Sequence, residues 1–408
     1  MDKCIDFAFS AQGYNHIKEQ KVCQDASSCF SDATMDIIAV ADGHGSNDYP
    51  RTDKGARFAV EAAISSTRQF VDLLFADGID LSADANQRLE QLAKNILSQW
   101  YSLVEKDAQS NPFSEKELLK VSDKYKQRYS SGQVPQKAYG TTLIMACVTK
   151  QFWFGLQIGD GKCVVLDSKC DTREPIPWDE SCQANITTSI CDSDAISEFR
   201  YYFSRNLPLA IFMGSDGIDD SYSSPEEYQS LYRSIVLLFA ESDEAKARNE
   251  VREYLPSLSR KGSGDDVSIA GILTPAVFNE KTLQLLKAIN NHSKAIGEHN
   301  RKANDAKMAS ERLDYVLSAI KHAKSAYDSA LQKEKDAREE IEHSRIALEE
   351  AERNLKTAEE ELAEAKSAFS SQNELANADM PSLVFSDDKT PSDIASTASQ
   401  MPTLTLEQ

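Results

Sequence analysis

The feature that most constrains this chain is a short apolar segment that ends abruptly in an acidic, glycine-rich turn. Ile37 to Ala41 is a run of β-prone residues, and Asp42-Gly43-His44-Gly45 follows it directly. Such a run predicts a buried strand, and the glycines let the backbone turn sharply at its end. We therefore expect Asp42 and His44 at a strand end, where a rigid sheet holds side chains in fixed positions.

Acidic turns of this kind recur along the chain. Asp25 lies in a polar loop. The other acidic turns adjoin clear apolar segments, and they are Asp160-Gly161, Asp216-Gly217 with Asp219 and Asp220, and Asp265-Asp266. Acidic residues favour turns, which explains any one of them. Carboxylates gathered at strand ends, however, repel one another unless cations are present. The whole set therefore predicts a site for Mg²⁺ or Mn²⁺, two of which can share a carboxylate and activate one water.

Composition narrows the classes of protein to which this chain can belong. The formal net charge of −20 argues against nucleic acid and anionic membranes as partners. The eight cysteines include no Cys-x-x-Cys pair, so a zinc site is unsupported. The first residues lack the features of a signal peptide, and no apolar run is long enough to span a bilayer. We predict a cytoplasmic protein with reduced cysteines.

Residues 1–275 carry mixed strand and helix signals. Short β-prone runs predict strands at Ile5–Ser10, Ile37–Ala41, Thr141–Val148, Phe152–Ile158, Lys162–Asp167, Leu209–Met213 and Val267–Leu273. Helices are predicted at Thr52–Phe75, Leu89–Val104, Glu115–Tyr129, Pro225–Glu241 and Asp243–Leu255. Two polar segments are predicted to be a loop and an irregular surface flap, His16–Ala26 and Asp171–Asn206. The tight turns between neighbouring strands indicate antiparallel hairpins.

The composition changes after Pro275. From Lys281 onward Gly and Pro almost vanish, and a heptad repeat places mostly large residues at one seam position (Leu313 to Phe369) and mostly Ala at the other (Val316 to Ala365). This pattern predicts an α-helical coiled coil over 281–370, with a partner chain or self-association through 300–370; the alternatives are a helical hairpin that packs on itself and a lone solvated helix. A break is expected near Gly297 or Asn300. Residues 371–408 are predicted to form a disordered tail rich in Ser, Thr and Pro.

Six short motifs, in order, make the chain resemble a known family. They are Cys23-Gln24-Asp25, Ala41-Asp42-Gly43-His44-Gly45, Gly140-Thr141-Thr142, Ile158-Gly159-Asp160-Gly161, Gly214-Ser215-Asp216-Gly217 with Asp220, and Gly264-Asp265-Asp266-Val267-Ser268. Together they resemble the metal-dependent serine/threonine protein phosphatases of type 2C, and the segment from Asp42 to Ala59 is similar to the bacterial branch. The resemblance implies an α+β fold for residues 1–276, a four-layer α-β-β-α sandwich of two antiparallel sheets flanked by helices.

The resemblance also implies a role for each motif residue. Asp42 would bridge two Mn²⁺ or Mg²⁺ ions, and the Gly43 carbonyl would ligate one of them. Asp216 and Asp265 would complete the coordination of the second ion, and Asp25 would hold metal-bound water. A third ion would bind at Asp160, Asp216 and Asp220. His44 would act as general acid and protonate the leaving alkoxide.

Two positions depart from the family pattern. Gln24 stands where many members have Glu, and Gln20 and Lys21 occupy the region where many carry a phosphate-binding Arg. The candidates for this missing function are His16, Lys18, Lys21 and Arg51, each of which can equally be an ordinary solvated loop charge. A lysine binds phosphate as a point charge, without the bidentate fork of arginine.

The implied reaction is hydrolysis of phosphoserine or phosphothreonine on protein substrates by a metal-activated water. The coiled coil would tether the enzyme to itself or to a partner. One alternative is a pseudophosphatase that binds phosphoproteins without turnover; the complete set of Asp ligands argues against it. The other alternative is a small-molecule phosphatase on the same fold.

Overall fold

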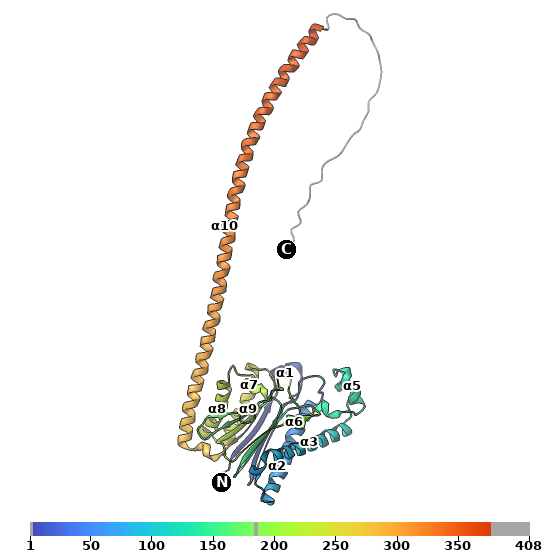
Figure 1. The fold of residues 1–408 in the computed structure, drawn as a ribbon, viewed down its shortest axis with the longest axis vertical. Helices are drawn as coiled ribbons and strands as arrows, with labels where there is room; N and C mark the ends of the chain where they lie inside the picture. The colour runs from blue at the N-terminus through green and yellow to red at the C-terminus, as the bar shows by residue number, and fades with distance from the viewer. Residues whose placement is uncertain (1–2, 183–186, 377–408) are drawn as a thin grey trace. The chain divides into compact units, whose positions relative to one another are not determined.

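The structure, a computed structural model, describes residues 3–182 and 187–376, with side chains in the last helix described up to Ala368. Two five-stranded antiparallel sheets form the centre of the fold, and helices cover their outer faces (Figure 1). The predicted α-β-β-α sandwich is therefore confirmed.

The first sheet has the strand order β1-β10-β9-β6-β7. Its strands are β1 (Ile5–Ala11), β10 (Val267–Leu273), β9 (Ala210–Gly214), β6 (Lys162–Leu166) and the short β7 (Thr172–Arg173). β1 pairs with β10 along its whole length, Ile5 opposite Leu273 and Ala11 opposite Val267. This pairing brings the loop after β1 next to the acidic turn before β10.

The second sheet has the strand order β2-β3-β4-β5-β8. Its strands are β2 (Ala26–Ser31), β3 (Met35–Ala41), β4 (Leu143–Thr149), β5 (Trp153–Ile158) and β8 (Arg200–Ser204). β3 lies between β2 and β4, and apart from its second residue it is buried. The acidic turn that follows β3 therefore leaves from the interior of the sheet.

Three apolar clusters hold the layers together. One packs α2 (Thr52–Ala76) and α3 (Ala85–Ser110) on the second sheet. Another packs α8 (Pro225–Glu241) and α9 (Glu244–Lys261) on the first sheet. The third lies between the sheets, where Ile38 and Ile144 of one meet Ile211 and Ile272 of the other. Short elements complete the fold: 3-10 turns η1 (Leu81–Ala83), η2 (Pro135–Tyr139) and η3 (Pro275–Phe278), and the helix α7 (Asp216–Asp219).

Three predicted segments differ from the structure. The helix expected at Glu115–Tyr129 is two helices, α4 (Glu115–Leu118) and α5 (Asp123–Ser130). The backbone N–H of Ser122 donates to Asp48 instead of continuing the first helix (2.8 Å). The predicted loop overlaps α1 (Tyr14–Glu19), and the predicted flap contains α6 (Ala195–Glu198) and the edge strand β8.

The last helix, α10 (Glu280–Ala376), contributes to two compact units, one ending at Lys307 and the other beginning at Met308. In the first unit, Leu286 is fully buried in the cluster under α8 and α9. Asn290 is buried as well, accepting from the hydroxyl of Ser230 (2.8 Å) and donating to that of Ser234 (3.0 Å). The start of α10 thus packs on the sandwich, and the predicted domain boundary at residue 276 stays a prediction.

The expected helix break near Gly297 or Asn300 is wrong, since α10 continues through both residues. Gly297 is buried, and a Cβ atom at this position would lie 3.2 Å from the side chain of Glu227 on α8. Glycine therefore serves close packing between α10 and α8 here.

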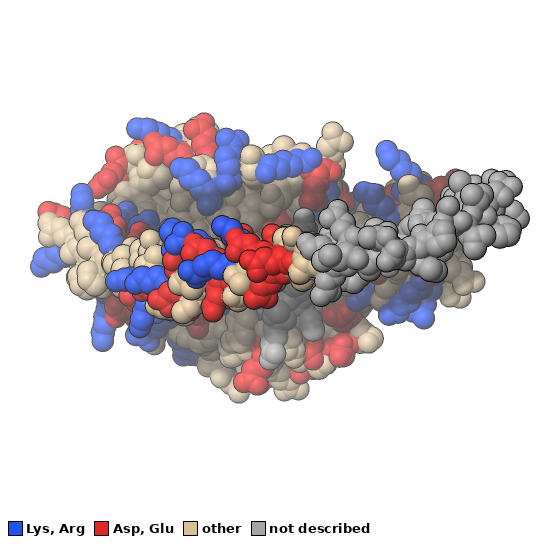
Figure 2. Space-filling model, turned by 90° about the horizontal axis from the view of Figure 1, so that it is seen from above, with Lys and Arg blue, Asp and Glu red and all other residues tan. Residues whose placement is uncertain are grey.

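In the second unit, every side chain of α10 from Met308 to Ala368 is exposed. The large seam residues are included, with Leu348 59% and Leu355 60% exposed. Charged side chains of both signs are mixed along the helix (Figure 2), and pairs such as Arg338–Glu334 (2.8 Å) join successive turns. Among the described residues, no helix has the length and apolar character that crossing a membrane requires. Residues 371–376, predicted as the start of the disordered tail, belong to α10, and the rest of the predicted tail lies outside the described residues from position 377 onward.

Candidate active site

The turn after β3 is fixed by the threonines that precede β4. The N–H of Asp42 donates to Thr142 Oγ1 (3.0 Å), and its carbonyl accepts from Thr142 N and Thr141 Oγ1 (both 2.8 Å). A Cβ atom on Gly43 would collide with the Thr52 side chain and the Gln24 carbonyl. The Gly140-Thr141-Thr142 motif therefore holds the Asp42 backbone in one position.

Two serines fasten the turns of β9 and β10 to each other. Ser215 N donates to the Ser268 carbonyl (3.1 Å), and Ser268 N donates to Ser215 Oγ (3.0 Å). Gly217 has no room for a Cβ atom because the Asp266 carbonyl lies against it. Asp216, at the start of α7, is thereby placed beside the Asp265-Asp266 turn.

Asp160 lies on the tight turn between β5 and β6. Gly159 has a φ of +102°, which favours glycine, and its N–H donates to Thr188 Oγ1 (3.0 Å). A Cβ atom on Gly161 would lie 2.8 Å from the Gly214 carbonyl at the end of β9. The turn therefore packs against the strand that leads to Asp216.

Seven carboxylates from these turns and from the loop before β2 act on one another. Burial raises the pKa of Asp42 well above its usual range, and the charges of Asp25, Asp216 and Asp160 raise it further. Burial and the charge of Asp266 raise the pKa of Asp25 to about 8. Burial, with the charges of Asp160, Asp265 and Asp220, raises the pKa of Asp216 to about 6. Each of the six Asp residues that the sequence proposed as metal ligands thus takes part in these charge interactions.

The chemistry of this cluster fits a divalent cation. Asp25 is 7% exposed, and neither of its carboxylate oxygens has a hydrogen-bond partner of normal geometry among the described residues, although the side chains of Ser215 and Ser268 lie near enough to lower its pKa. A buried carboxylate without a partner is strongly unfavourable unless a proton or a cation compensates it. The proposed donors are all oxygens, which suit Mg²⁺ and Mn²⁺ better than softer metals. Asp219 belongs to the same region, since its Oδ1 is also buried without a partner and burial raises its pKa to about 7.

Asp265 and Asp266 have different surroundings. Asp266 accepts from the N–H groups of Gly13 and Gln24 (both 2.5 Å), and His16 Nδ1 lies 2.9 Å from it. Asp265 keeps its side chain 59% exposed, and its charge acts on Asp216 and Asp220. His16, Asp265 and Asp266 bring three ligand-type atoms within 4.8 Å of one another. Because Asp266 is already occupied by backbone donors, we interpret it and His16 as the anchor of the loop that carries Asp25.

His44, two residues after Asp42, lies among residues that the sequence did not single out. Its ring contacts that of Tyr49 (centroids 4.8 Å apart), and a Cβ atom on Gly140 would clash with both rings. Lys137 lies over the Tyr49 ring and pairs with Asp192 (2.8 Å). Burial and the Lys137 charge lower the pKa of His44 to about 4.

The cations proposed for phosphate binding are mostly engaged elsewhere. Arg51 is 3% exposed and pairs with Glu117 (2.7 Å) and Asp107 (3.4 Å), so its guanidinium fork is committed to carboxylates. Lys21 pairs with Glu19 (2.9 Å), and Lys18 lies over the Tyr14 ring. Lys137, which no sequence motif indicated, is the cation whose charge acts on His44.

Comparisons with known proteins give one family. The family model described as Protein phosphatase 2C matches residues 12–256. No curated protein matches the chain.

Several solved structures are similar to the chain. The serine/threonine phosphatase Stp1 from Staphylococcus aureus is 16% identical, with a TM-score of 0.42, over 66% of this chain and 95% of that one. PppA, a key regulatory component of T6SS in Pseudomonas aeruginosa, is 15% identical, with a TM-score of 0.41, over 67% and 98%. A C. elegans sex determining protein is 14% identical, with a TM-score of 0.45, over 70% and 68%.

Proposed function

The chain belongs to the protein phosphatase 2C family, and we propose that it hydrolyses phosphoserine and phosphothreonine on proteins with bound Mn²⁺ or Mg²⁺. The observation that carries the metal dependence is the carboxylate cluster, and above all the buried Asp25, whose two oxygens have no hydrogen-bond partner of normal geometry among the described residues. When bound, the cations supply a Lewis acid that activates water and offsets the charge of the phosphoryl group.

The residues of the cluster would divide this work. Asp42, the Gly43 carbonyl, Asp216 and Asp265 would hold two ions, and Asp25 would hold metal-bound water. Asp160 and Asp220, with Asp216, would hold a third ion. The fixed backbone of Asp42 supports this assignment, because a ligand shared by two ions tolerates little movement.

We assign His44 the transfer of a proton to the leaving alkoxide. Without substrate its imidazole is held neutral by burial and by Lys137. A phosphoryl dianion beside the ring favours the protonated form by its charge, so the acid forms when substrate is bound. We also propose that Lys137 contacts the same phosphoryl group, in the role that the sequence left without a residue, by exchanging its ion pair with Asp192 (2.8 Å) for phosphoryl oxygens.

The test is phosphate release from a phosphothreonine peptide by the full chain, before and after chelation. We expect activity only with Mn²⁺ or Mg²⁺, and its loss in Asp42→Asn and Asp216→Asn. Asp123→Asn, at an exposed position on α5, is the control. Undiminished activity after chelation contradicts the metal dependence. Peptide binding without turnover would favour the pseudophosphatase, and turnover of small phosphoesters alone would favour the small-molecule phosphatase.

We also propose that α10 from Met308 onward is a coiled-coil tether in a cytoplasmic enzyme. Its exposed seam supports this, since association removes apolar surface from water at roughly 25 cal/mol per Å². Partner choice would then depend on flanking charges such as Lys324 and Glu352. Light scattering on the full chain and on a chain ending at Lys307 tests self-association. Monomers in both cases would leave a heterologous partner as the only form of the proposal.

A further inference from the structure

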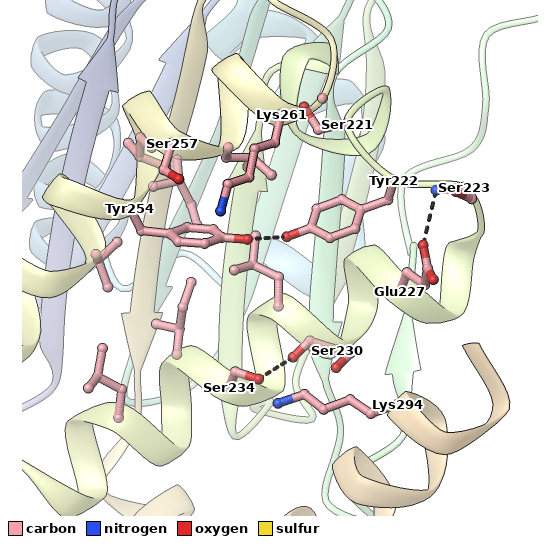
Figure 3. Close-up of a pocket in the computed structure, with 18 of the residues that line it drawn as sticks. Ser221, Tyr222, Ser223, Glu227, Ser230, Ser234, Tyr254, Ser257, Lys261 and Lys294 are labelled. Carbon is pink, nitrogen blue, oxygen red and sulfur yellow. Dashed lines mark hydrogen bonds between the residues drawn. The ribbon is translucent and has the colours of Figure 1, made fainter. Parts of the chain in front are cut away.

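Two surfaces outside the carboxylate cluster have no assigned occupant. One is a pocket of about 720 Å³ between α8, α9 and the start of α10, whose lining carries Glu227 as well as Lys261 and Lys294 (Figure 3). Its mixed charges favour no class of ligand. The other is the exposed seam of α10 from Leu313 to Ala365. The seam carries more information, because its sequence decides which residues of a partner helix fit opposite it.

The seam consists of two rows of side chains that differ in size. The large row is Leu313, Ile320, Tyr327, Glu334, Ile341, Leu348, Leu355 and Leu362, and the small row is Val316, Ala323, Ala330, Ala337, Ser344, Ala351, Ala358 and Ala365. The apolar side chains of the large row are 54–68% exposed. Because α10 is one continuous helix through both rows, folding back of the chain does not cover them, and a partner is needed.

The two rows fit each other better than each fits its own copy. In a parallel pair in register, layers of two large side chains alternate with layers of two alanines. Helices that the large residues hold apart leave cavities at the alanine layers, and closer helices overpack the large residues. In an antiparallel pair, each layer joins one residue of the large row with one of the small row, so the layers have similar volumes. The sizes therefore favour an antiparallel partner with the same two rows.

One antiparallel register of two copies of this chain matches the rows over their whole length. It places Ile341 opposite Ala337 of the second copy, and a two-fold axis between these positions makes every contact occur twice. The layers, with one residue from each copy, are Leu313–Ala365, Ile320–Ala358, Tyr327–Ala351, Glu334–Ser344, Ile341–Ala337, Leu348–Ala330, Leu355–Ala323 and Leu362–Val316. Only the last of these layers lacks a residue as small as Ala or Ser.

The polar residues of the seam select the same register. It places Glu334 opposite Ser344 of the second copy, whose hydroxyl is a donor for the carboxylate. A shift by one heptad puts Glu334 opposite Ala337 or Ala351, and a parallel pair in register puts it opposite its own copy. A buried carboxylate without a donor, or two that face each other, is unfavourable.

The charges beside the seam are compatible with this register. Lys324 and Glu352 each follow a residue of the small row, and they lie on the same side of the antiparallel pair at similar heights. They therefore attract each other twice across the two-fold axis. Arg338 lies near its own copy at the axis, and its pair with Glu334 (2.8 Å) offsets that charge.

We infer that the partner of α10 is a second copy of this chain, paired antiparallel along residues 313–365 and centred between Ala337 and Ile341. The inference rests on the proposed tether and adds its partner, direction and register. The two copies of Leu313 then lie about 80 Å apart, at opposite ends of the pair.

Cysteine pairing in the full chain tests the direction and the register. Ile320→Cys and Ala358→Cys are prepared separately, oxidised alone and as an equilibrated equal mixture, and resolved by non-reducing gel electrophoresis. We expect a disulfide-linked dimer in the mixture and, in each variant alone, only the background of the parent, whose eight cysteines all precede the seam. Linkage in Ile320→Cys alone indicates a parallel pair and overturns the inference, as does the absence of linkage in the mixture.

Sedimentation equilibrium of full-length variants tests the layers. Ala330→Leu places two leucines in the layer shared with Leu348 and should weaken the dimer about tenfold, whereas in a parallel pair it would fill a cavity and strengthen the dimer. Adding Leu348→Ala exchanges the two sizes within the layer and should restore the affinity. Ala363→Leu, at an exposed position outside both rows, is the control. Tighter association of Ala330→Leu, or no recovery in the double variant, overturns the inference.

These outcomes are separate from those of the proposed function. The measurements need neither metal nor turnover, and every variant keeps the carboxylate cluster, so its activity with Mn²⁺ should equal that of the parent. A full chain that is monomeric at tens of micromolar overturns the inference, and the tether then requires a different partner. A parallel dimer also overturns it, and the tether itself then stands.

Discussion

Leu286 provides a sharp test of whether the start of α10 belongs to the phosphatase unit. It is fully buried in the cluster under α8 and α9, while its neighbour Leu285 is 47% exposed. Replacing a buried Leu by Ala destabilises a protein by about 2–5 kcal/mol, because transfer free energy is lost and a cavity remains. Both substitutions keep helix propensity nearly constant, so Leu285→Ala is a matched control expected within about 0.5 kcal/mol of the parent.

Urea unfolding followed by tryptophan fluorescence measures the difference in stability between the two variants, and its signal comes from the sandwich. The chain's three tryptophans are Trp100, Trp153 and Trp178, so the signal reports the sandwich rather than the long helix. We expect the free energy of unfolding to fall by about 2–5 kcal/mol in Leu286→Ala. A midpoint unchanged from the parent, or the same shift in both variants, would refute the packing of α10 on the sandwich.

The same reasoning predicts how truncations behave. A chain ending at Lys307 keeps Leu286 and Asn290 and should unfold like the parent, while a chain ending at residue 276 exposes the wall that they cover. Equal stability and activity of the two truncations would instead support the domain boundary that the composition predicts.

Three further outcomes follow from the site. His44→Ala should lower turnover more for alkyl phosphoesters than for p-nitrophenyl phosphate, whose leaving group needs no proton; an equal loss on both substrates would remove His44 from the acid role. Thr142→Val leaves the N–H of Asp42 unpaired, so it should destabilise the chain by about 1–3 kcal/mol and reduce metal-dependent turnover. The control is Thr67→Val, which removes a buried hydroxyl that has no partner among the described residues and should change neither stability nor turnover. Arg51→Met should lower the free energy of unfolding by about 3 kcal/mol, because two carboxylates lose a buried partner. Arg57→Met breaks an exposed ion pair and should change the free energy of unfolding by less than about 1 kcal/mol. Similar values for the two variants would contradict the burial of Arg51.

Local signals predicted the elements that depend on local chemistry. The bounds of α8 and β10 agree with the predicted Pro225–Glu241 and Val267–Leu273. Ser224 caps α8 with Pro225 at its first position, which is a strong start signal in the sequence. β8 was missed because it is a short edge strand inside a polar segment, and its pairing with β5 is a tertiary interaction.

Some residues of the candidate site were predictable from local motifs, and others could be found only in the folded chain. Acidic turns after apolar runs were visible as motifs, and the sheet topology brings them together. The sequence did not reveal Lys137 and Asp192, because they come from a 3-10 turn and the flap and meet beside His44 only in the folded chain. Arg51 shows the reverse error: it was chosen for its charge, and its partners Glu117 and Asp107 lie far along the sequence.

The long helix shows what a periodic pattern leaves open. A heptad is local information, so it predicts a helix and the seam along it; the partner is a property of two surfaces. Single-turn pairs such as Arg338–Glu334 add only about 0.3–0.5 kcal/mol each, too little to compensate an exposed seam over many turns. Glu334 and Ser344 also occupy seam positions among the large residues and alanines. Burying them is unfavourable in any register that leaves them without polar partners, so these two positions would discriminate between partners and registers more strongly than the apolar positions around them.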